Sequence, residues 1–223
     1  MSYMQRFATT CEAVAGTTKK LVKTAIVAEY LKSRTVDEAA ISAVFFSGRP
    51  FPVWEETTLR IGGRLLWRIV AELAGKDESE LSAAYRKHGD LGAVAEAVLP
   101  SRAPSDLNLL VVERTFRRIA VTRGPSEKAA IMRDLLSRTT PLEAKYIVKI
   151  TTGDLRIGLK ESLVEEAIAK AYEATLVEVQ RANMLLGDIG SALRLAEEGK
   201  LREARMRLFH PLGFMLASSI ETP

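Results

Sequence analysis

Residues 151–160 read Thr-Thr-Gly-Asp-Leu-Arg-Ile-Gly-Leu-Lys, and residues 57–64 repeat the pattern as Thr-Thr-Leu-Arg-Ile-Gly-Gly-Arg. Both segments contain Leu-Arg-Ile-Gly, and both lead into a stretch whose apolar residues recur at the three- and four-residue intervals of one helix face. The chain therefore uses the same turn-to-helix device twice.

A glycine-containing turn that opens a helix is suited to bind phosphate. Glycine permits a positive φ and has no Cβ to hold a ligand away. The first N–H groups of the helix have no acceptor within the helix and lie at the positive end of its dipole. The arginine inside each turn adds formal charge. One alternative stays open, in which the leucine and isoleucine plug the core, the arginine is solvated and the turn is only a tight connection.

The composition indicates a folded, globular protein. Of the 223 residues, 47% are hydrophobic and 27% are charged, so the chain can bury a substantial core as one large domain or two small ones. No apolar run approaches the roughly 20 residues that span a bilayer, and the N-terminus lacks a signal-peptide layout. We therefore expect no membrane partner. The expected location is the cytoplasm, associated with the nucleoid, in a prokaryote, or the nucleus in a eukaryote.

Few residues are suited to metal binding or nucleophilic chemistry. The single cysteine, Cys11, cannot form an internal disulfide and lies on an apolar helical row, so we expect it to be buried. The only histidines, His88 and His210, cannot form a metal-ligand cluster. We identify no catalytic residue and no metal ligand in the sequence.

The charge is moderately basic. The net charge is +4, and 20 arginines stand against 12 lysines, which fits bidentate recognition of phosphate. The excess of positive over negative residues is not concentrated in a basic tail in either half of the chain. A cationic surface must therefore be assembled by folding.

The apolar periodicity and the capping signals predict an all-α fold, a compact array of about a dozen helices in two pseudo-symmetric halves. We expect a helical domain over residues 1–207, with halves of about 1–100 and 106–207 and a hinge at residues 100–106. On the second helix, Leu21, Val22, Ala25, Ile26 and Tyr30 are expected to face inward. The expected helices cover about residues 3–15, 18–33, 35–47, 63–74, 77–88, 91–99, 107–122, 126–138, 141–151, 160–173, 175–186 and 189–198.

Two lysines precede the second turn. Lys145 and Lys149 are separated by four residues, so they lie on one face of the helix over residues 141–151. Together with Arg156 and Lys160 they are expected to form one cationic rim.

Several motifs resemble the N-terminal DNA-binding domain of ATP-dependent DNA ligases. The match covers nearly the whole chain, and the Leu-Arg-Ile-Gly-Leu segment is its most specific part. The motifs are Phe7-Ala8, Cys11-Glu12, Thr18-Lys19-Lys20, Gly89-Asp90-Leu91-Gly92 with Ala95-Glu96, Glu143-Ala144-Lys145-Tyr146-Ile147, and Gly153-Asp154-Leu155-Arg156-Ile157-Gly158-Leu159 with Ser162-Leu163 and Ala167.

The resemblance implies an all-helical, pseudo-twofold domain that lies across the minor groove of nicked duplex DNA. Carried over by position, Gly153, Arg156 and Gly158 form one contact turn, and Gly62 and Gly63 form the other. Binding through phosphates and the minor groove is largely independent of base sequence. The expected DNA-binding residues are Arg60, Gly62, Gly63, Arg64, Lys145, Lys149, Thr152, Gly153, Arg156, Gly158 and Lys160.

The family's catalytic motif is absent from this sequence. Such ligases attach adenylate to the lysine of Lys-x-Asp-Gly, and none of the 12 lysines here is followed by that pattern. Residues 208–223 look like a linker toward an adenylation domain, and Phe214-Met215-Leu216-Ala217 resembles the start of that domain. The resemblance therefore implies a chain that is inactive alone. Its partners would be nicked duplex DNA and the ligase adenylation and OB-fold domains, which use ATP and Mg²⁺.

Two other functions remain open. The chain could be a helical scaffold that docks a protein partner, or a repair factor with a helix-hairpin-helix turn. A DNA-binding surface that neutralises about six phosphates predicts a log–log salt slope near −5, whereas a protein-docking surface predicts none toward DNA. We also expect valine at Gly62 or at Gly158 to weaken duplex binding with little change in helicity. The sequence does not distinguish replication from repair or recombination.

Overall fold

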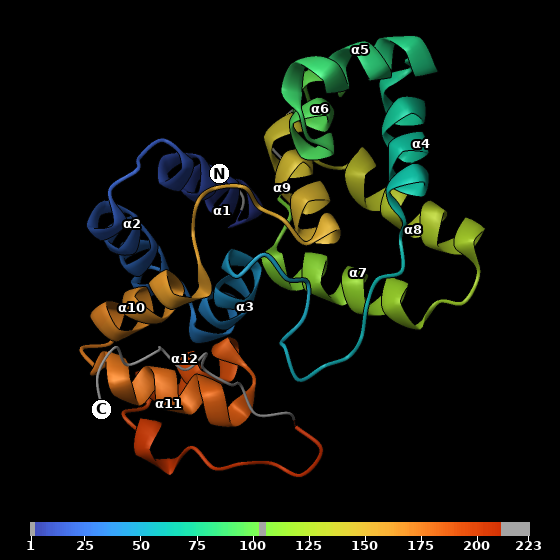
Figure 1. The fold of residues 1–223 in the computed structure, drawn as a ribbon. Coiled ribbons are helices and arrows are strands. Elements are labelled where there is room, and N and C mark those ends of the chain that lie inside the picture. The colour runs from blue at the N-terminus through green and yellow to red at the C-terminus, as the bar shows by residue number, and fades with distance from the viewer. Residues whose placement is uncertain (1–2, 103–105, 211–223) are drawn as a thin grey trace, which may run out of the picture.

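The structure, a computed structural model, describes residues 3–102 and 106–210 (Figure 1). Within these ranges it contains helices and no strand, which confirms the predicted all-α class. The helices are α1 (Tyr3–Ala15), α2 (Lys20–Lys32), α3 (Val36–Phe46), α4 (Gly63–Ala74), α5 (Glu78–His88), α6 (Leu91–Val98), α7 (Leu109–Val121), α8 (Pro125–Ser137), α9 (Pro141–Thr152), α10 (Glu161–Ala171), α11 (Leu176–Leu186), α12 (Ile189–Glu197) and the short 3-10 helix η1 (Leu201–Glu203).

Local signals set most helix boundaries. Capping boxes begin α3, α5 and α9, where Thr35, Asp77 and Thr140 each accept the backbone N–H of a glutamate that bonds back to the cap. Left-handed glycines follow α4, α5, α9 and α11. These ends lie close to the predicted ones. None of the described helices is long and apolar enough to cross a membrane.

The start and the buried face of α2 differ from the prediction. The helix begins at Lys20 rather than at residue 18, and its N-cap, Lys19, makes no side-chain cap. Leu21 is 82% exposed, and the helix buries Lys23 and Thr24 instead. The reason is tertiary: Lys23 donates to the Ile157 carbonyl, and Thr24 donates to Glu166 on α10. Partners distant in sequence therefore turn the helix away from its apolar stripe.

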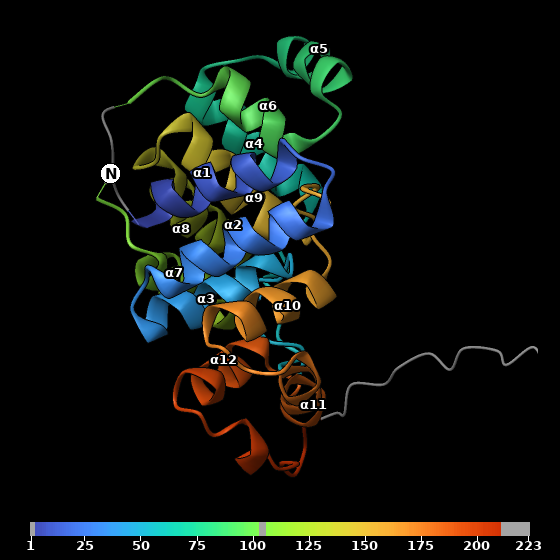
Figure 2. The ribbon, with the colours of Figure 1, turned by 90° about the vertical axis from the view of Figure 1, so that its left-hand side faces the viewer.

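The helices form two lobes that exchange segments. Helices α1–α3 pack with α10–α12, and the closest associations are α2 with α10 and α3 with α12. Helices α4–α9 form the other lobe, in which α6 lies on α9 and α4 on α8. Figures 1 and 2 show the lobes stacked along the long axis of the molecule, with α11 and α5 at opposite ends. Each half of the sequence thus supplies three helices to each lobe, so the halves of the chain are not the lobes.

A pseudo-twofold relation accounts for this exchange. The order α1–α3 corresponds to α7–α9, and α4–α6 corresponds to α10–α12. Only two connections cross between the lobes within the described residues, α3 to α4 and α9 to α10, and each carries one Leu-Arg-Ile-Gly turn (Figure 1). Gly48 and Gly153, with φ of 80° and 78°, begin the two crossings. A Cβ added to Gly48 would lie 3.6 Å from the Gly153 carbonyl oxygen, so the crossings meet near the pseudo-axis.

A second internal repeat positions the lobes. Gly89-Asp90-Leu91-Gly92 and Gly187-Asp188-Ile189-Gly190 begin α6 and α12, each with the aspartate as N-cap. A Cβ at Gly92 would lie 2.7 Å from the Lys145 carbonyl oxygen, and one at Gly190 would lie 2.9 Å from that of Ala40. Both glycines are therefore required where α6 crosses α9 and α12 crosses α3.

One continuous apolar core joins the two lobes. Phe7, Phe45 and Phe116 are fully buried, and Cys11 is buried as predicted. Residues 49–58, which lie between two expected helices, form a loop, and Trp54 in this loop stacks on His210 with ring centroids 4.1 Å apart. Part of the expected hinge, residues 103–105, and the segment 214–217 that resembles the start of an adenylation domain lie outside the described residues.

Candidate nucleic-acid interface

The two turns share an uncommon backbone conformation. Arg60 and Arg156 have φ of 50° and 52°, in the left-handed region that non-glycine residues rarely occupy. Leu59 and Leu155 beside them are buried, whereas both arginines are exposed. Each turn therefore plugs the core with its leucine and holds its arginine outward at a conformational cost. Strain repeated at two equivalent positions is typical of a functional site.

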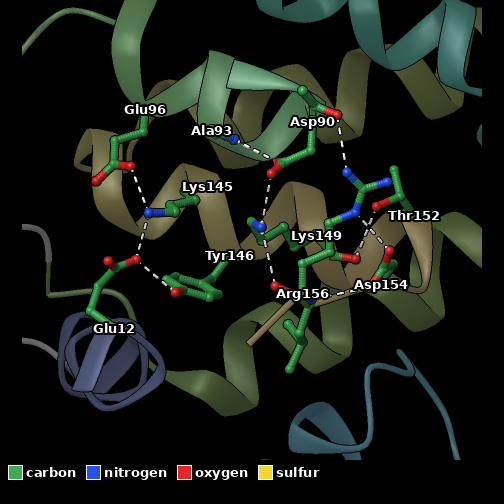
Figure 3. A network of polar contacts seen from close by, with 12 residues as sticks. Glu12, Asp90, Ala93, Glu96, Lys145, Tyr146, Lys149, Thr152, Asp154 and Arg156 are labelled. Atoms are coloured by element: carbon green, nitrogen blue, oxygen red, sulfur yellow. Dashed lines mark hydrogen bonds and ion pairs between the residues drawn. The ribbon is translucent and has the colours of Figure 1, made fainter. Parts of the chain in front are cut away.

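The second turn is held from below by Lys149. Its ammonium, on a side chain that is only 7% exposed, lies 3.1 Å from Asp90 Oδ2 and donates to the Leu155 carbonyl at 3.1 Å (Figure 3). Asp90 also caps α6 through the N–H of Ala93. Burial alone would raise the pKa of Asp90, but these hydrogen bonds outweigh it and lower the pKa of the carboxyl. Lys149 thereby joins α9, α6 and the turn.

Lys145 belongs to a neighbouring network. Its ammonium lies 2.5 Å from Glu12 Oε1 and 2.8 Å from Glu96 Oε2, and the Tyr146 hydroxyl donates to Glu12 at 2.6 Å (Figure 3). Burial opposes ionisation of Glu12, yet the hydrogen bonds from Lys145 and Tyr146 lower the pKa of its carboxyl. The predicted cationic rim is therefore wrong for both lysines, because the carboxylates of Glu12 and Glu96 neutralise Lys145 and that of Asp90 neutralises Lys149. Arg156 and Lys160 are exposed, as the rim required.

Arg156 is exposed but tethered. Its Nε donates to Asp154 Oδ2 at 2.8 Å, and its Nη1 donates to the Gly89 carbonyl at 3.0 Å (Figure 3). The hydrogen bond to Asp154 raises the pKa of the guanidinium. Arg60, by contrast, makes no hydrogen bond or ion pair within the described part of the chain.

Two buried lysines hold the turns in a way that the sequence analysis missed. Lys23, 6% exposed, donates to the Ile157 carbonyl at 2.5 Å, and Lys128, 4% exposed, donates to the Leu59 carbonyl at 2.7 Å. They are the fourth residues of α2 and α8, which correspond in the pseudo-twofold arrangement. Burial, with a smaller contribution from Arg60, lowers the pKa of Lys128. No local pattern signals either role, because a lysine in a helix is ordinarily solvated.

The helix N-termini divide into two groups. The four helices without a side-chain cap are α2, α4, α8 and α10. Every other α-helix whose N-cap is described has one. The uncapped starts form two equivalent pairs, since α2 and α10 meet at the second turn and α4 and α8 at the first. Free N–H groups therefore gather at both turns.

Hollows in the surface bring most of the predicted residues together. Arg60 shares one hollow of about 320 Å³ with Thr152 and Gly153. Gly63 shares another, of about 460 Å³, with Thr152 and Arg156. The two turns therefore border one face. Arg64 is exposed on the first turn of α4.

A third hollow, of about 510 Å³, lies between the starts of α2 and α10. Gly158 and Lys160 line it opposite Thr17, Thr18 and Lys20. The last three residues are absent from the predicted DNA-binding set. Their signal in the sequence was the Thr18-Lys19-Lys20 motif, which was used only for the resemblance.

The predicted glycines are of two kinds. Gly153 and Gly158 have positive φ, and a Cβ at Gly158 would lie 2.7 Å from Lys23 Nζ. Gly62 has an ordinary φ of −71°, and neither it nor Gly63 has an atom within 4 Å of an added Cβ. The protein itself does not require glycine at residues 62 and 63. The left-handed φ of Gly158 predicts that valine there is strained and lowers stability, whereas Gly62 has room for a side chain. The expected small change in helicity stays a prediction for both variants.

Metal binding has no support among the described side chains, where no group of three or more His, Cys, Asp or Glu could hold an ion.

The chain as a whole is similar to known proteins. The family described as "DNA ligase N terminus" matches residues 2–169. A "Probable DNA ligase" of Koribacter versatilis is 58% identical over 98% of the chain, which spans 38% of that relative. A "Probable DNA ligase" of Opitutus terrae is 37% identical over 96% of the chain, and a "DNA ligase" of Methanocella arvoryzae is 34% identical over 95%. The chain spans 24% and 39% of these two relatives.

Proposed function

The chain belongs to the DNA ligase N-terminal family, and from this premise we propose that it holds nicked duplex DNA for a ligase catalytic region. It binds the phosphate backbone across the minor groove through its two turns. Binding is independent of base sequence, because phosphate contacts position a protein without reading bases.

The grouping of uncapped helix N-termini carries this proposal. Four helix starts lack a side-chain acceptor, and they gather in equivalent pairs at the two turns. Their unsatisfied N–H groups and dipoles favour an anion at each turn. Among the α-helices whose N-caps are described, only these four starts lack side-chain caps, and a protein-docking scaffold has no reason for that grouping.

The proposed contacts follow from exposure. Phosphates are bound by the exposed cations Arg60, Arg64, Arg156 and Lys160, with Lys20 as the addition from the structure. The DNA backbone can approach the two turns closely at Gly62, Gly63, Thr152, Gly153 and Gly158. Lys145 and Lys149 support the interface from inside through their carboxylate partners.

Sealing a nick requires groups that this chain does not supply. The sequence has no Lys-x-Asp-Gly motif, so we propose that ATP and Mg²⁺ act in adenylation and OB-fold regions elsewhere in the ligase. The contribution of this chain is to hold the break at high effective concentration near those regions.

Fluorescence anisotropy on nicked duplex, intact duplex and single-stranded DNA tests the proposal, each across a salt titration. We expect duplex binding with little sequence preference and a log–log slope near −5 for about six phosphates. Replacing Lys20 and Lys160 by glutamine should reduce the slope by about two units. The control Lys200→Gln with Arg202→Gln removes the same charge near the 3-10 helix and should leave the slope unchanged. Absence of duplex binding at low salt would overturn the proposal in favour of a protein-docking scaffold.

A further inference from the structure

An aromatic pair lies on the proposed DNA face without a role in the phosphate contacts. Trp67 on α4 and Tyr85 on α5 meet edge to face, with ring centroids 5.7 Å apart and planes at 63°. Tyr85 is 42% exposed, and Trp67 is partly exposed. Trp67 Nε1 donates to Glu78 Oε2 at 3.2 Å, which fixes the indole on α4.

Both rings line the hollow that joins the two turns. This hollow of about 460 Å³ is bordered by Gly63 from the start of α4 and by Thr152 and Arg156 from the second crossing. Because Gly63 has no atom within 4 Å of an added Cβ, the hollow is open on that side. A strand that runs between the two turns along this hollow therefore passes the aromatic pair.

The charges of the hollow are already paired within the protein. Lys149 pairs with Asp90, and Arg156 pairs with Asp154. The lining thus carries two positive and two negative groups, so apart from the exposed Arg156, whose side chain can also reach a phosphate, it has no excess of positive charge. The hollow between α2 and α10 differs, since its lining holds four cations, Lys20, Lys23, Arg156 and Lys160, and a single glutamate, Glu166. What the aromatic hollow offers a ligand is a neutral, apolar ring surface.

The other repeat excludes a purely structural reason for the rings. Helices α10 and α11 correspond to α4 and α5, and counting from their starts places Glu165 at the position of Trp67 and Asn183 at that of Tyr85. Asn183 Nδ2 donates to Glu165 Oε1 at 2.9 Å. A polar pair therefore joins the same two helices equally well in this fold, so the fold itself does not demand exposed aromatic rings.

We propose that the Trp67–Tyr85 hollow binds a deoxyribose ring of the duplex, between the phosphates held by the two turns. The C–H face of the sugar packs against the electron-rich faces of the rings. The sugar is the neutral ring that a strand presents between successive phosphates, and it is present whatever the base. This site rests on the proposed DNA binding and adds an uncharged component to it.

The test measures affinity and salt slope for Tyr85→Ala, Tyr85→Phe and the parent chain on intact duplex. We expect Tyr85→Ala to bind about five- to tenfold more weakly with an unchanged slope, because no phosphate contact is lost. Tyr85→Phe should bind like the parent. Tyr3→Ala is the control, because it removes a tyrosine of similar exposure, 43%, that lies beside Arg34. Arg34 follows the end of α2 that is away from the turns, so Tyr3→Ala should leave affinity and slope unchanged. Far-ultraviolet circular dichroism and thermal unfolding check that the variants are folded.

Three results would overturn the sugar site. Tyr85→Ala could bind like the parent, or its slope could fall by one unit, which would indicate a phosphate contact. The loss of affinity in Tyr85→Ala could also differ between duplexes made only of A·T pairs and duplexes made only of G·C pairs, which would indicate a base contact. Failure of the parent chain to bind any duplex is a separate outcome, and it removes the DNA-binding proposal itself.

Discussion

The two Leu-Arg-Ile-Gly turns share a sequence and a left-handed arginine, but they are held differently. The second turn rests on Lys23 and on Lys149 with Asp90, and its Arg156 is tied to Asp154 and Gly89. The first turn rests on Lys128 alone, and its Arg60 is untethered within the described residues. The comparison teaches that the local sequence sets the shape of the turn, while contacts from other helices set its rigidity.

Lys149→Met should give the largest effect. It removes the partner of a largely buried carboxylate, so we expect a loss of about 3 kcal/mol in the free energy of unfolding. Lys128→Met removes the buried ammonium that supports the first turn, which has no carboxylate partner among the described residues. Its expected loss is about 1 kcal/mol or less. Urea unfolding measures both, and equal losses would mean that the two turns are held alike.

Gly158→Val should be next in size. The left-handed φ and the nearby Lys23 ammonium predict a loss of about 2 kcal/mol in unfolding free energy. At Gly62 an added side chain meets open space, but Gly62 is the N-cap of α4, where valine is less favourable than glycine. The loss of unfolding free energy in Gly62→Val should therefore stay below about 1 kcal/mol. Duplex affinity should fall for both variants. Undiminished affinity in folded Gly62→Val would show that DNA does not approach the first turn closely.

Acid should weaken the second turn through Asp90. The pKa of Asp90 is lowered from 3.8 in the folded protein, so its stabilisation is complete well above that value and is lost as pH falls through the lowered pKa. We expect Asp90→Asn to cost about 1.5 kcal/mol at pH 7 and to approach the parent as pH falls through the lowered pKa. Asp188→Asn, at the equivalent cap without a lysine, serves as control in urea unfolding at each pH. A constant Asp90→Asn deficit across that range would contradict this assignment.

The smallest stability effects are expected at the arginines themselves. Arg60→Ala should leave stability unchanged and reduce the salt slope of duplex binding by about one unit. Arg156→Ala should reduce the slope similarly and also lower stability slightly, because its ion pair is exposed. Thermal unfolding measures the effect of each variant on stability, and salt-dependent anisotropy measures its effect on the slope of duplex binding. If Arg60→Ala lowers stability more than Arg156→Ala, the contrast between the turns is wrong.

Helix positions were predictable because their signals are local. A capping box such as Thr140 with Glu143, or a glycine such as Gly153 after the last turn, acts within a few residues of the helix end. The repeat Gly89-Asp90-Leu91-Gly92 and Gly187-Asp188-Ile189-Gly190 was also present in the sequence. It shows that the α6 and α12 starts are equivalent, although spacing alone does not reveal which helices they cross.

The sequence by itself determined the all-α class, the helix boundaries and the two turns, because hydrogen bonds within a few residues of each other decide them. Only the tertiary structure decided the exchange of helices between lobes, the buried face of α2 and the interior roles of Lys23, Lys128, Lys145 and Lys149. The physical reason is that a lysine side chain can be solvated or buried at the same helical position. The carbonyls and carboxylates that stabilise these buried ammonium groups come largely from segments distant in the sequence.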